Sequence, residues 1–441
     1  MSKHDFQNAA RGGCDASRRA FVSNLARGLL GVTAGGMIGG RIGAQTLGQP
    51  LLTLAPRHEP AQQVIYLFLR GGMSHLDTLD PKPGAATQGP TEAIRTRADG
   101  VQLSQHFPLL ADQMDKACII SSMTSTQGAH QQAQYMMRTS YEKRGTIQHA
   151  SLGAWHNRIV DRQNSTLPGH VIVGGAADMP SAGFFPPQYA ALPIGSAESG
   201  LQNSRRPRGV TERRFQDRLE RLAKMNQTFS DNHPQREVKA YGEMYADAVR
   251  LMRSNDLAAF DIAEEPEAMR QAYGADEDFG AGCLLARRLV EHGVRFVEVV
   301  SNGWDTHADN FDRIADLTPA IDRGLAALLA DLEGRGLLRQ TLVVLASEFG
   351  RTPDIDQDQG RNHYPKAFSC LLAGGGVRGG PRFGKTDKEG REVIENDVTI
   401  PDFNATIAYG LGIPLDRQIV SDSGRPFTVA DKGYPVTELF G

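Results

Sequence analysis

Apolar runs rich in β-branched residues recur along the chain, and each ends in a cluster of polar residues. Four of these runs lie at residues 64–69, 117–120, 294–300 and 342–346. Continuous runs of Val, Leu and Ile are typical of strands that are buried on both faces of a parallel sheet. The pattern therefore predicts an α/β fold, with a doubly wound, mostly parallel sheet and helices on both faces.

The stretches between these runs suggest how the chain is divided. Residues 176–209 are rich in Pro, Gly and Ser, and residues 211–292 show mostly helical spacing. We therefore expect one large α/β domain over residues 63–441, with a mainly helical insertion around 176–292. A linker is predicted at residues 45–62.

Residues 1–44 have the features of an export signal. Arg18 and Arg19 stand just before a mildly apolar, glycine-rich run, and the pattern S-R-R-x-F resembles the twin-arginine signal. The alternative, an amphipathic surface helix, would be weakened by the many glycines. Arg27 and Arg41 interrupt the run, so we expect no permanent membrane span. The segment predicts an encounter with the twin-arginine translocon and a periplasmic or extracellular location.

Composition narrows the possible partners. The formal net charge is -3, charged residues make up 22% of the chain, and no basic stripe with interleaved aromatic residues is present, which argues against a nucleic-acid partner. The four cysteines are widely spaced and form no C-x-x-C pair. They predict small buried apolar residues and not a disulfide framework or a zinc knuckle.

Polar residues gather just after the later strands of the predicted sheet. Asp305 and His307 follow one strand, Glu348 follows the next, and His363 lies in a Gly-flanked loop soon after. In open α/β sheets ligands bind beyond the carboxyl ends of the strands, and carboxylates with imidazoles suit a divalent ion such as zinc, manganese or calcium. The alternative, that these are helix caps and surface polar residues, explains the nearby Asp309 and Asp312 but not why His307, Glu348 and His363 all follow strands.

The loop after the first strand is a second candidate part of the same site. Its paired glycines allow close approach of backbone to a ligand, and His75 and Asp77 follow directly. We expect His75 or Asp77 to be a metal ligand. Arg70, Arg351 and Arg361 are candidates for binding an anionic substrate, because guanidinium groups suit tetrahedral oxyanions. The alternative for each arginine is a structural ion pair.

Hydroxyl groups also stand ahead of a predicted helix. Ser125 and Thr126 precede His130, where a helical pattern begins. Helix N-termini stabilise anions and activate nucleophiles, although Ser and Thr at this position are more often helix caps. Thr126 or Ser125 is therefore a candidate nucleophile, and His130 or His75 a candidate general acid or base.

Four motifs together resemble a known family. They are GG-x-S-H-x-D-T-x-D-P-K-P at residues 71–83, W-D-T-H at 304–307, S-E-F-G-R-T-P at 347–353 and G-R-N-H at 360–363. Over nearly its full length the chain resembles the bacterial family named domain of unknown function 1501, which is similar to the alkaline phosphatase superfamily of sulfatases, pyrophosphatases and phosphomutases. The resemblance implies two metals at the carboxyl edge of the sheet and a nucleophile at a helix N-terminus after the second strand.

The resemblance also assigns roles to individual residues. Asp305 and His307 resemble the superfamily's Asp-x-x-x-His pair, His363 its final His, and Glu348 the Asp of its Asp-His-Gly motif. Thr126 lies four residues before His130, which is the spacing of the threonine nucleophile in the pyrophosphatase branch.

The sequence also departs from the superfamily pattern. The Asp-x-His spacing is shorter, and Phe349 replaces a second His and so costs a second metal one ligand. Arg70 and Gly71 stand in place of Asp-Gly after the first strand. The absence of Cys-x-Pro-Ser-Arg makes a formylglycine sulfatase an unfavoured reading.

The sequence thus predicts an exported, metal-dependent hydrolase of phosphate or sulfate esters, acting on a small-molecule or glycan ester. A non-catalytic exported binding protein on the same fold is the alternative, because a fold does not fix a function.

Overall fold

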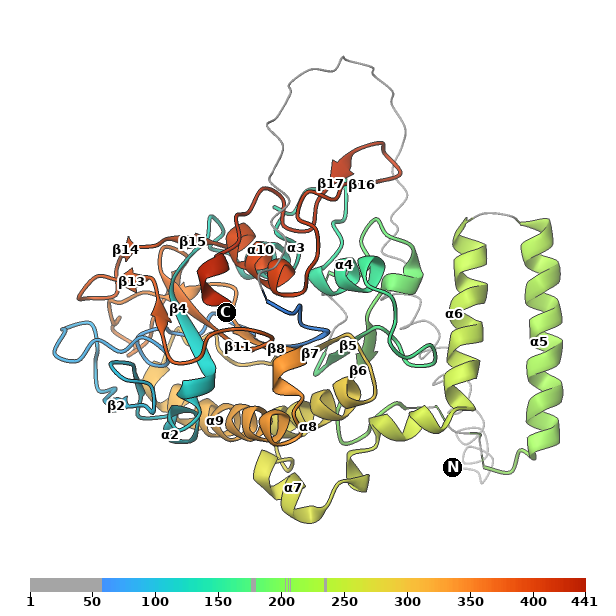
Figure 1. The fold of residues 1–441 in the computed structure, drawn as a ribbon, viewed down its shortest axis with the longest axis horizontal. Coiled ribbons are helices and arrows are strands. Elements are labelled where there is room, and N and C mark those ends of the chain that lie inside the picture. The colour runs from blue at the N-terminus through green and yellow to red at the C-terminus, as the bar shows by residue number, and fades with distance from the viewer. Residues whose placement is uncertain (1–57, 176–179, 203, 205, 207, 234–235) are drawn as a thin grey trace, which may run out of the picture.

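The computed structural model describes residues 58–441 except 176–179, 203, 205, 207 and 234–235 (Figure 1). The predicted export signal, with Arg18 and Arg19, lies outside the described residues, as does most of the predicted linker. Within the described ranges no helix is both long and apolar enough to cross a membrane.

A nine-stranded sheet forms the centre of the molecule. The strands lie in the order β12 (Arg382–Phe383), β4 (Ala117–Thr124), β11 (Phe368–Gly374), β8 (Thr341–Ala346), β1 (Gln63–Leu69), β7 (Phe296–Ser301), β5 (His170–Val173) and β6 (Leu192–Ile194), and β15 (Val398–Thr399) also pairs with β4. All pairings are parallel except the two made by β11, with β4 and with β8. The four predicted strands share this one sheet, which confirms the mostly parallel fold class.

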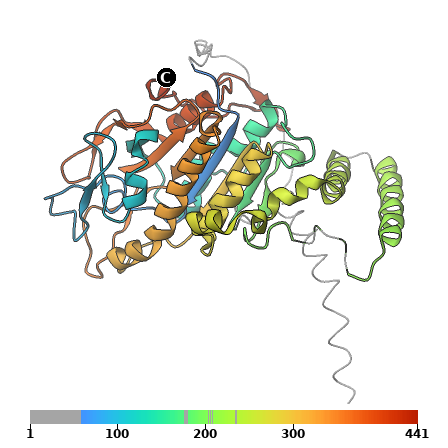
Figure 2. The ribbon, with the colours of Figure 1, turned by 60° about the horizontal axis from the view of Figure 1, so that its bottom comes forward.

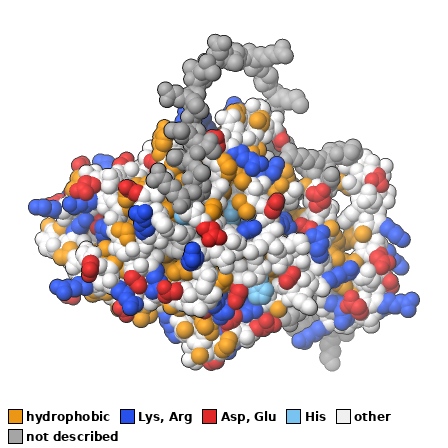
Figure 3. All heavy atoms as spheres, viewed as in Figure 1, with side chains coloured by type: hydrophobic (Ala, Val, Ile, Leu, Met, Phe, Trp, Pro, Cys, Tyr) orange, Lys and Arg blue, Asp and Glu red, His pale blue; other side chains and the backbone are white. Residues whose placement is uncertain are grey.

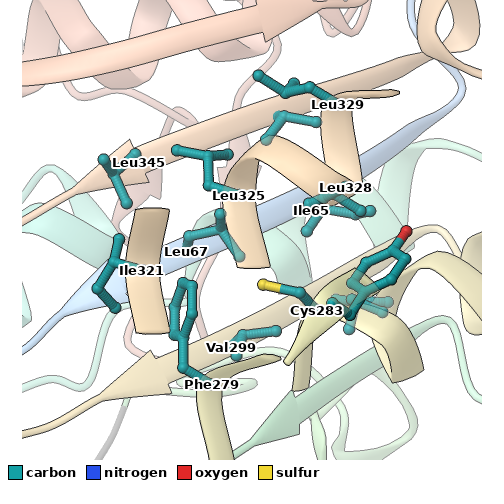
Figure 4. Close-up of a cluster of buried hydrophobic side chains, with 14 of the residues drawn as sticks. Ile65, Leu67, Phe279, Cys283, Val299, Ile321, Leu325, Leu328, Leu329 and Leu345 are labelled. Atoms are coloured by element: carbon teal, nitrogen blue, oxygen red, sulfur yellow. The ribbon is translucent and has the colours of Figure 1, made fainter. Parts of the chain in front are cut away.

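Helices cover both faces of the sheet because its central strands carry apolar side chains on both sides. Ile65 and Leu67 of β1 belong to one buried cluster, and Tyr66 and Phe68 to the other. The first cluster is completed by α2 (Pro108–Ala111), α8 (Asp278–Glu291) and α9 (Asn310–Gly334), and the second by α3 (His130–Thr139), α4 (Leu152–Ile159) and α10 (Ile400–Gly410). Figure 2 shows α8 and α9 running along the sheet, and Figure 4 shows their side chains against those of β1.

Some elements within residues 176–292 belong to the central α/β body, and others project from it. Within this range β6 joins the edge of the sheet and α8 packs on its face. By contrast, α5 (Glu212–Asn232) forms a hairpin with α6 (Arg236–Met252) and stands away from the body in Figures 1 and 2. The helix α6 packs against η2 (Pro187–Tyr189) and η3 (Asn255–Phe260), and α7 (Glu267–Tyr273) lies against α9. On the face drawn in Figure 3, basic and acidic side chains are intermingled.

Short elements complete the described chain. Four two-stranded ribbons are β2 (Ala93–Arg95) with β3 (Gln102–Ser104), β9 (Gly350–Arg351) with β10 (His363–Tyr364), β13 (Lys385–Thr386) with β14 (Val393–Glu395), and β16 (Ile419–Val420) with β17 (Pro426–Phe427). The 3-10 helices are η1 (Met114–Lys116), η2 (Pro187–Tyr189), η3 (Asn255–Phe260), η4 (Ile262–Glu264), η5 (Leu338–Gln340) and η6 (Thr437–Leu439). The ribbon of β9 and β10 is the one that bears on the site described next.

Candidate metal centre

Four side chains from three separate stretches of the sequence meet beyond the carboxyl ends of the parallel strands. Asp305 and His307 follow β7, and His130 begins α3, the helix after β4. His363 lies in β10, which pairs with β9 so that His363 stands opposite Arg351. The loops that follow the parallel strands meet at this edge of the sheet.

The four side chains converge on one carboxylate oxygen. Asp305 Oδ1 lies 3.3 Å from His130 Nε2, 3.1 Å from His307 Nε2 and 3.4 Å from His363 Nε2. The Nε2 atoms of His307 and His363 are 2.9 Å apart. Three imidazole nitrogens therefore face the same small volume.

Hydrogen bonds on the opposite ring nitrogen fix which face each imidazole presents. His363 Nδ1 donates to the backbone carbonyl of Gly128 at 2.9 Å, and His307 Nδ1 donates to Asn362 Oδ1 at 2.9 Å. His130 Nδ1 donates to Glu348 Oε1 at 2.7 Å. Because each Nδ1 carries the proton, each Nε2 of a neutral ring has a free lone pair, and all three lone pairs face Asp305.

Glu348 lies behind His130 and not among the converging atoms. Its side chain is completely buried. Besides His130, its oxygens accept from Gln134 Nε2 at 2.9 Å and from the Gly71 backbone N–H at 3.0 and 3.1 Å. The sequence suggests Glu348 as a metal ligand. In the structure Glu348 is instead a hydrogen-bond acceptor that orients the imidazole of His130.

Arg351 contacts the same Asp305 oxygen as the three imidazoles. Its guanidinium is fully buried and donates to Asp305 Oδ1 at 2.5 Å, to Gly72 O at 2.8 Å and to Arg361 O at 3.0 Å. Arg351, predicted as a substrate contact, thus makes its charged contact with Asp305.

Glycines allow the loops to come this close together. Gly71 has a φ of +131°, and a Cβ there would lie 2.4 Å from the Asp305 nitrogen. A Cβ on Gly360 would lie 1.8 Å from the His307 carbonyl oxygen. Both glycines belong to the sequence motifs, so the motifs encode backbone contact as well as chemistry.

Electrostatics favour positive charge among the converging atoms. Burial opposes ionisation of Asp305, but the hydrogen bond and charge of Arg351 outweigh it and lower its pKa to about 2. The hydrogen bond to Glu348 raises the pKa of His130. Burial lowers the pKa of His363, and the nearby His130 and Arg351 add to the effect. Asp305 is therefore an anion at neutral pH, and His130 favours a cation at its Nε2, where a metal ion would take the place of a proton.

These residues fit a divalent metal ion. His130 Nε2 is buried and has no hydrogen-bond partner, and the ligand atoms of His130, Asp305 and His363 all lie within 4.8 Å of one another. Ligands bound to one ion at about 2.1 Å lie roughly 3.0 to 3.4 Å apart in octahedral or tetrahedral geometry. Imidazoles with one carboxylate suit zinc, manganese or iron better than calcium.

The other candidates in the first loop lie in a separate buried network. Asp77 accepts from Arg361 Nε at 2.8 Å and from Asn310 Nδ2 at 2.9 Å, and both Asp77 and Arg361 are buried. His75 is buried and lies 2.9 Å from the Gly390 carbonyl oxygen through its Nε2. The structure does not bring His75, Asp77 or Arg361 to the three imidazoles. Asp77 and Arg361 join two of the motif loops, and His75 contacts the loop at Gly390.

The predicted nucleophiles lie on the loop ahead of α3. The Thr126 side chain is exposed, and its hydroxyl contacts Met136 Sδ at 3.8 Å, while Ser125 Oγ lies 3.1 Å from the Gln127 nitrogen. Neither caps α3, whose N-cap is Ala129 without a side-chain bond. In the described part of the chain, the hydroxyls of Thr126 and Ser125 form no hydrogen bond to Asp305 or to the three imidazoles. The backbone of Arg70 joins the site, because its carbonyl accepts from the Trp304 N–H at 3.2 Å.

The sequence alone did not single out two supporting residues. Asn362 orients His307, and Gln134 binds Glu348. Asn362 stands inside the G-R-N-H motif, so its position beside His363 was an available signal. Gln134 lies one helical turn after His130, and that spacing places both on one face of α3.

The sequence comparisons identify a family. The family model described as "Protein of unknown function (DUF1501)" matches residues 61–440. No curated protein matches the sequence significantly.

Solved structures with a similar chain trace include three hydrolase-related proteins. The PsFucS1 sulfatase from Pseudoalteromonas sp. has 14% identity and a TM-score of 0.39, covering 80% of this chain and 68% of that one. The phosphonate monoester hydrolase SpPMH from Silicibacter pomeroyi has 13% identity and a TM-score of 0.39, covering 86% and 76%. A protein in the alkaline phosphatase superfamily from Vibrio parahaemolyticus has 9% identity and a TM-score of 0.36, covering 92% and 81%.

Proposed function

The chain belongs to the family described as protein of unknown function (DUF1501), and we propose that it is an exported, metal-dependent hydrolase of phosphate or sulfate esters. One observation carries the proposal: three imidazoles, each with its Nδ1 hydrogen-bonded to an oxygen, turn Nε2 toward a single carboxylate oxygen. Without a cation this arrangement would set lone pairs against one another and against an anion.

The residues would divide the work as follows. His130, His363 and Asp305 would hold the ion, with His307 beside them. The ion would supply Lewis acidity by polarising ester oxygens and offsetting the charge that develops in the transition state. Asp305 and His307 are both 46% exposed as side chains, so an ester can reach this centre from solvent.

Water is the attacking group that the geometry favours. The side-chain hydroxyls of Thr126 and Ser125 contact Gln127 and Met136, and the Ser125 backbone N–H donates to the Pro365 carbonyl oxygen at 2.8 Å. A covalent intermediate on Thr126 would need this loop to turn toward Asp305. We therefore expect Thr126→Ala to keep most of the activity, and loss of activity in that variant would instead favour the threonine nucleophile.

The discriminating experiment pairs metal analysis with a substrate panel. The exported protein would be assayed for zinc, manganese, iron and calcium, and then against aryl phosphate, phosphodiester, phosphonate and sulfate esters. Stoichiometric transition metal with hydrolysis of any ester class supports the proposal. Absence of metal would refute a metal-dependent hydrolase and favour the non-catalytic binding protein. Bound metal with no hydrolysis across the panel would also favour the non-catalytic binding protein.

Export belongs to the same proposal and rests on the twin-arginine pattern in the sequence. Replacing Arg18 and Arg19 by Lys should leave the precursor in the cytoplasm, because the translocon reads the arginine pair. Cell fractionation with an antibody against the chain measures this. A matched Lys replacement of Arg27, outside the pair, should leave export unchanged. Unchanged secretion of the double variant would refute the twin-arginine signal.

A further inference from the structure

We infer that the centre holds a single divalent ion and that the buried guanidinium of Arg351 is its fixed second positive charge. The inference rests on the proposed metal centre and specifies how that centre is built. Arg351 acts here as a positioning residue, because it reaches the ligand set through Asp305 and not through solvent.

The supply of ligand atoms sets the number of ions. In the described part of the chain, one group of His, Cys, Asp and Glu side chains has ligand atoms close enough to share an ion, and its members are His130, Asp305 and His363. His307 lies beside this group, in contact with Asp305 and His363, but is not one of its members. The three members of the group could share one ion.

Among the described residues, Glu348 is the other carboxylate in contact with this group, and its hydrogen-bonding capacity is already used. Glu348 Oε1 accepts from His130, Gln134 and Gly71, and Oε2 accepts from Gly71 and lies 3.3 Å from Ser347 Oγ. A second ion would have to break this buried set of hydrogen bonds to gain one ligand. Each broken bond would leave a buried donor without a partner.

The guanidinium of Arg351 donates to Asp305 Oδ1, the oxygen that the imidazoles face. Besides Asp305 Oδ1, its guanidinium donates to the carbonyl oxygens of Gly71, Gly72, Trp304 and Arg361. Its side chain has no exposed surface. A cation held by this many buried acceptors cannot move aside, and an arginine does not lose its charge at any physiological pH.

Two consequences follow from a fixed charge at this place. Asp305 is neutralised and held in position before any metal arrives, so the ligand set is preorganised. Any ion bound to Asp305 Oδ1 lies close to this guanidinium, and a second divalent ion would add further like-charge repulsion. The repulsion favours one ion per chain.

The stoichiometry test uses the full chain. Metal-free protein would be titrated with Mn²⁺ by calorimetry, and the loaded protein would be examined by elemental analysis and electron paramagnetic resonance. We expect one ion per chain and the spectrum of an isolated Mn²⁺. Two ions per chain, or a spin-coupled spectrum, would overturn the inference and leave the hydrolase proposal standing. Absence of specific binding would overturn the proposed function, and the inference with it.

The role of Arg351 is tested by a matched pair of conservative variants. Arg351→Lys keeps the charge but loses the fork of donors, so Asp305 is no longer held, and we expect Mn²⁺ affinity to fall roughly 10- to 100-fold. The control is Arg287→Lys, which alters an equally buried arginine paired with Glu265 and Asp331 away from the centre. We expect that control to bind Mn²⁺ within about threefold of the parent chain. Equal affinities in the two variants would overturn the role given to Arg351.

Discussion

At the residue scale, the hydrogen bond on the far side of each imidazole decides what that histidine can do. His363 is held by a backbone carbonyl, so its Nε2 is committed to the centre. His363→Ala should reduce bound metal and any esterase activity together, because the remaining ligands lose a partner and the Asp305 charge is less compensated. Elemental analysis of the purified variant measures the first and the ester panel the second.

The matched control is His233→Ala, a change at an exposed histidine at the end of α5, away from the sheet edge. It should keep both metal and activity. If the His363 variant also retained full metal content, His363 would be a structural residue of the β9–β10 ribbon.

Glu348 offers the second prediction at this scale. In Glu348→Gln the amide would turn an NH₂ group toward the donors of His130, Gln134 or Gly71, so His130 would lose its fixed orientation. Metal affinity should fall about 10- to 100-fold, and the free energy of unfolding by roughly 1–3 kcal/mol. Metal titration and urea unfolding measure the two effects. Glu395→Gln, at an exposed position in β14, should change neither, and an equal response in both variants would contradict the role of Glu348.

The sequence predicted this edge of the sheet better than it predicted the individual atoms. Asp305, His307 and His363 were expected to meet, and they do. Glu348 was expected beside them and lies one layer further back, because its position directly after β8 points it under His130 and the Gly71 backbone. A rule about strand ends names the loops that gather, but the direction of each side chain depends on contacts between loops that no local pattern specifies.

At the element scale, the loop after β1 and the loop after β8 are built against each other. Gly72 has a φ of +87°, and a Cβ there would lie 2.6 Å from the Phe349 ring. That ring lies beneath His130 and His363, with centroids 5.0 and 4.6 Å away. Gly72→Ala should therefore displace Phe349, weaken metal binding at least tenfold, and destabilise the fold by more than the roughly 1–3 kcal/mol of backbone strain alone.

Gly84→Ala is a close control for this prediction. Gly84 has nearly the same φ, +85°, but a Cβ there has no neighbour within 4 Å. The control should show the backbone cost without the loss of metal, as measured by thermal unfolding and Mn²⁺ titration. Equal metal affinities in the two alanine variants would show that Phe349 does not position the histidines.

The strands themselves were predictable where they were apolar. β1 and β8 begin one residue before the predicted runs and end where those runs end. β4 continues past the predicted Ile120 to Thr124, because Ser121 and Ser122 are buried with partners in Arg382 and in the Asn396 carbonyl. Those partners lie far along the chain, so an apolar pattern could not extend the strand. The reversed direction of β11 also has no local signal, since it depends on the path of the preceding loop.

At the scale of the whole molecule, buried neutral histidines make stability depend on pH. His156 in α4 and His170 in β5 are buried, their ring nitrogens have no hydrogen-bond partner, and burial lowers both pKa values to about 3. The unfolded chain takes up these protons below its ordinary pKa of about 6.5, whereas the native state does not until about pH 3. Stability is therefore full above about pH 6.5 and is lost as the pH falls toward 3.

The size of this effect can be measured on metal-free protein. Between pH 7 and pH 5 each histidine should remove about 2 kcal/mol from the free energy of unfolding in urea, or about 4 kcal/mol together. His170→Asn should reduce the loss by about 2 kcal/mol, while His233→Asn at the exposed end of α5 should leave it unchanged. The same pH dependence in the His170 variant as in the parent chain would refute this account.

The helix α5, in the hairpin with α6, should be less stable locally than the central sheet. Among the described residues α5 has no buried side chain, and Met225 and Phe229 on its surface are more than half exposed. Its amide protons are therefore protected by little beyond the helix itself, so they should exchange with deuterium through local opening long before those of β1 or β8. The candidate metal centre, fixed to the slowest-exchanging strands, would keep its geometry while α5 repeatedly unfolds and refolds.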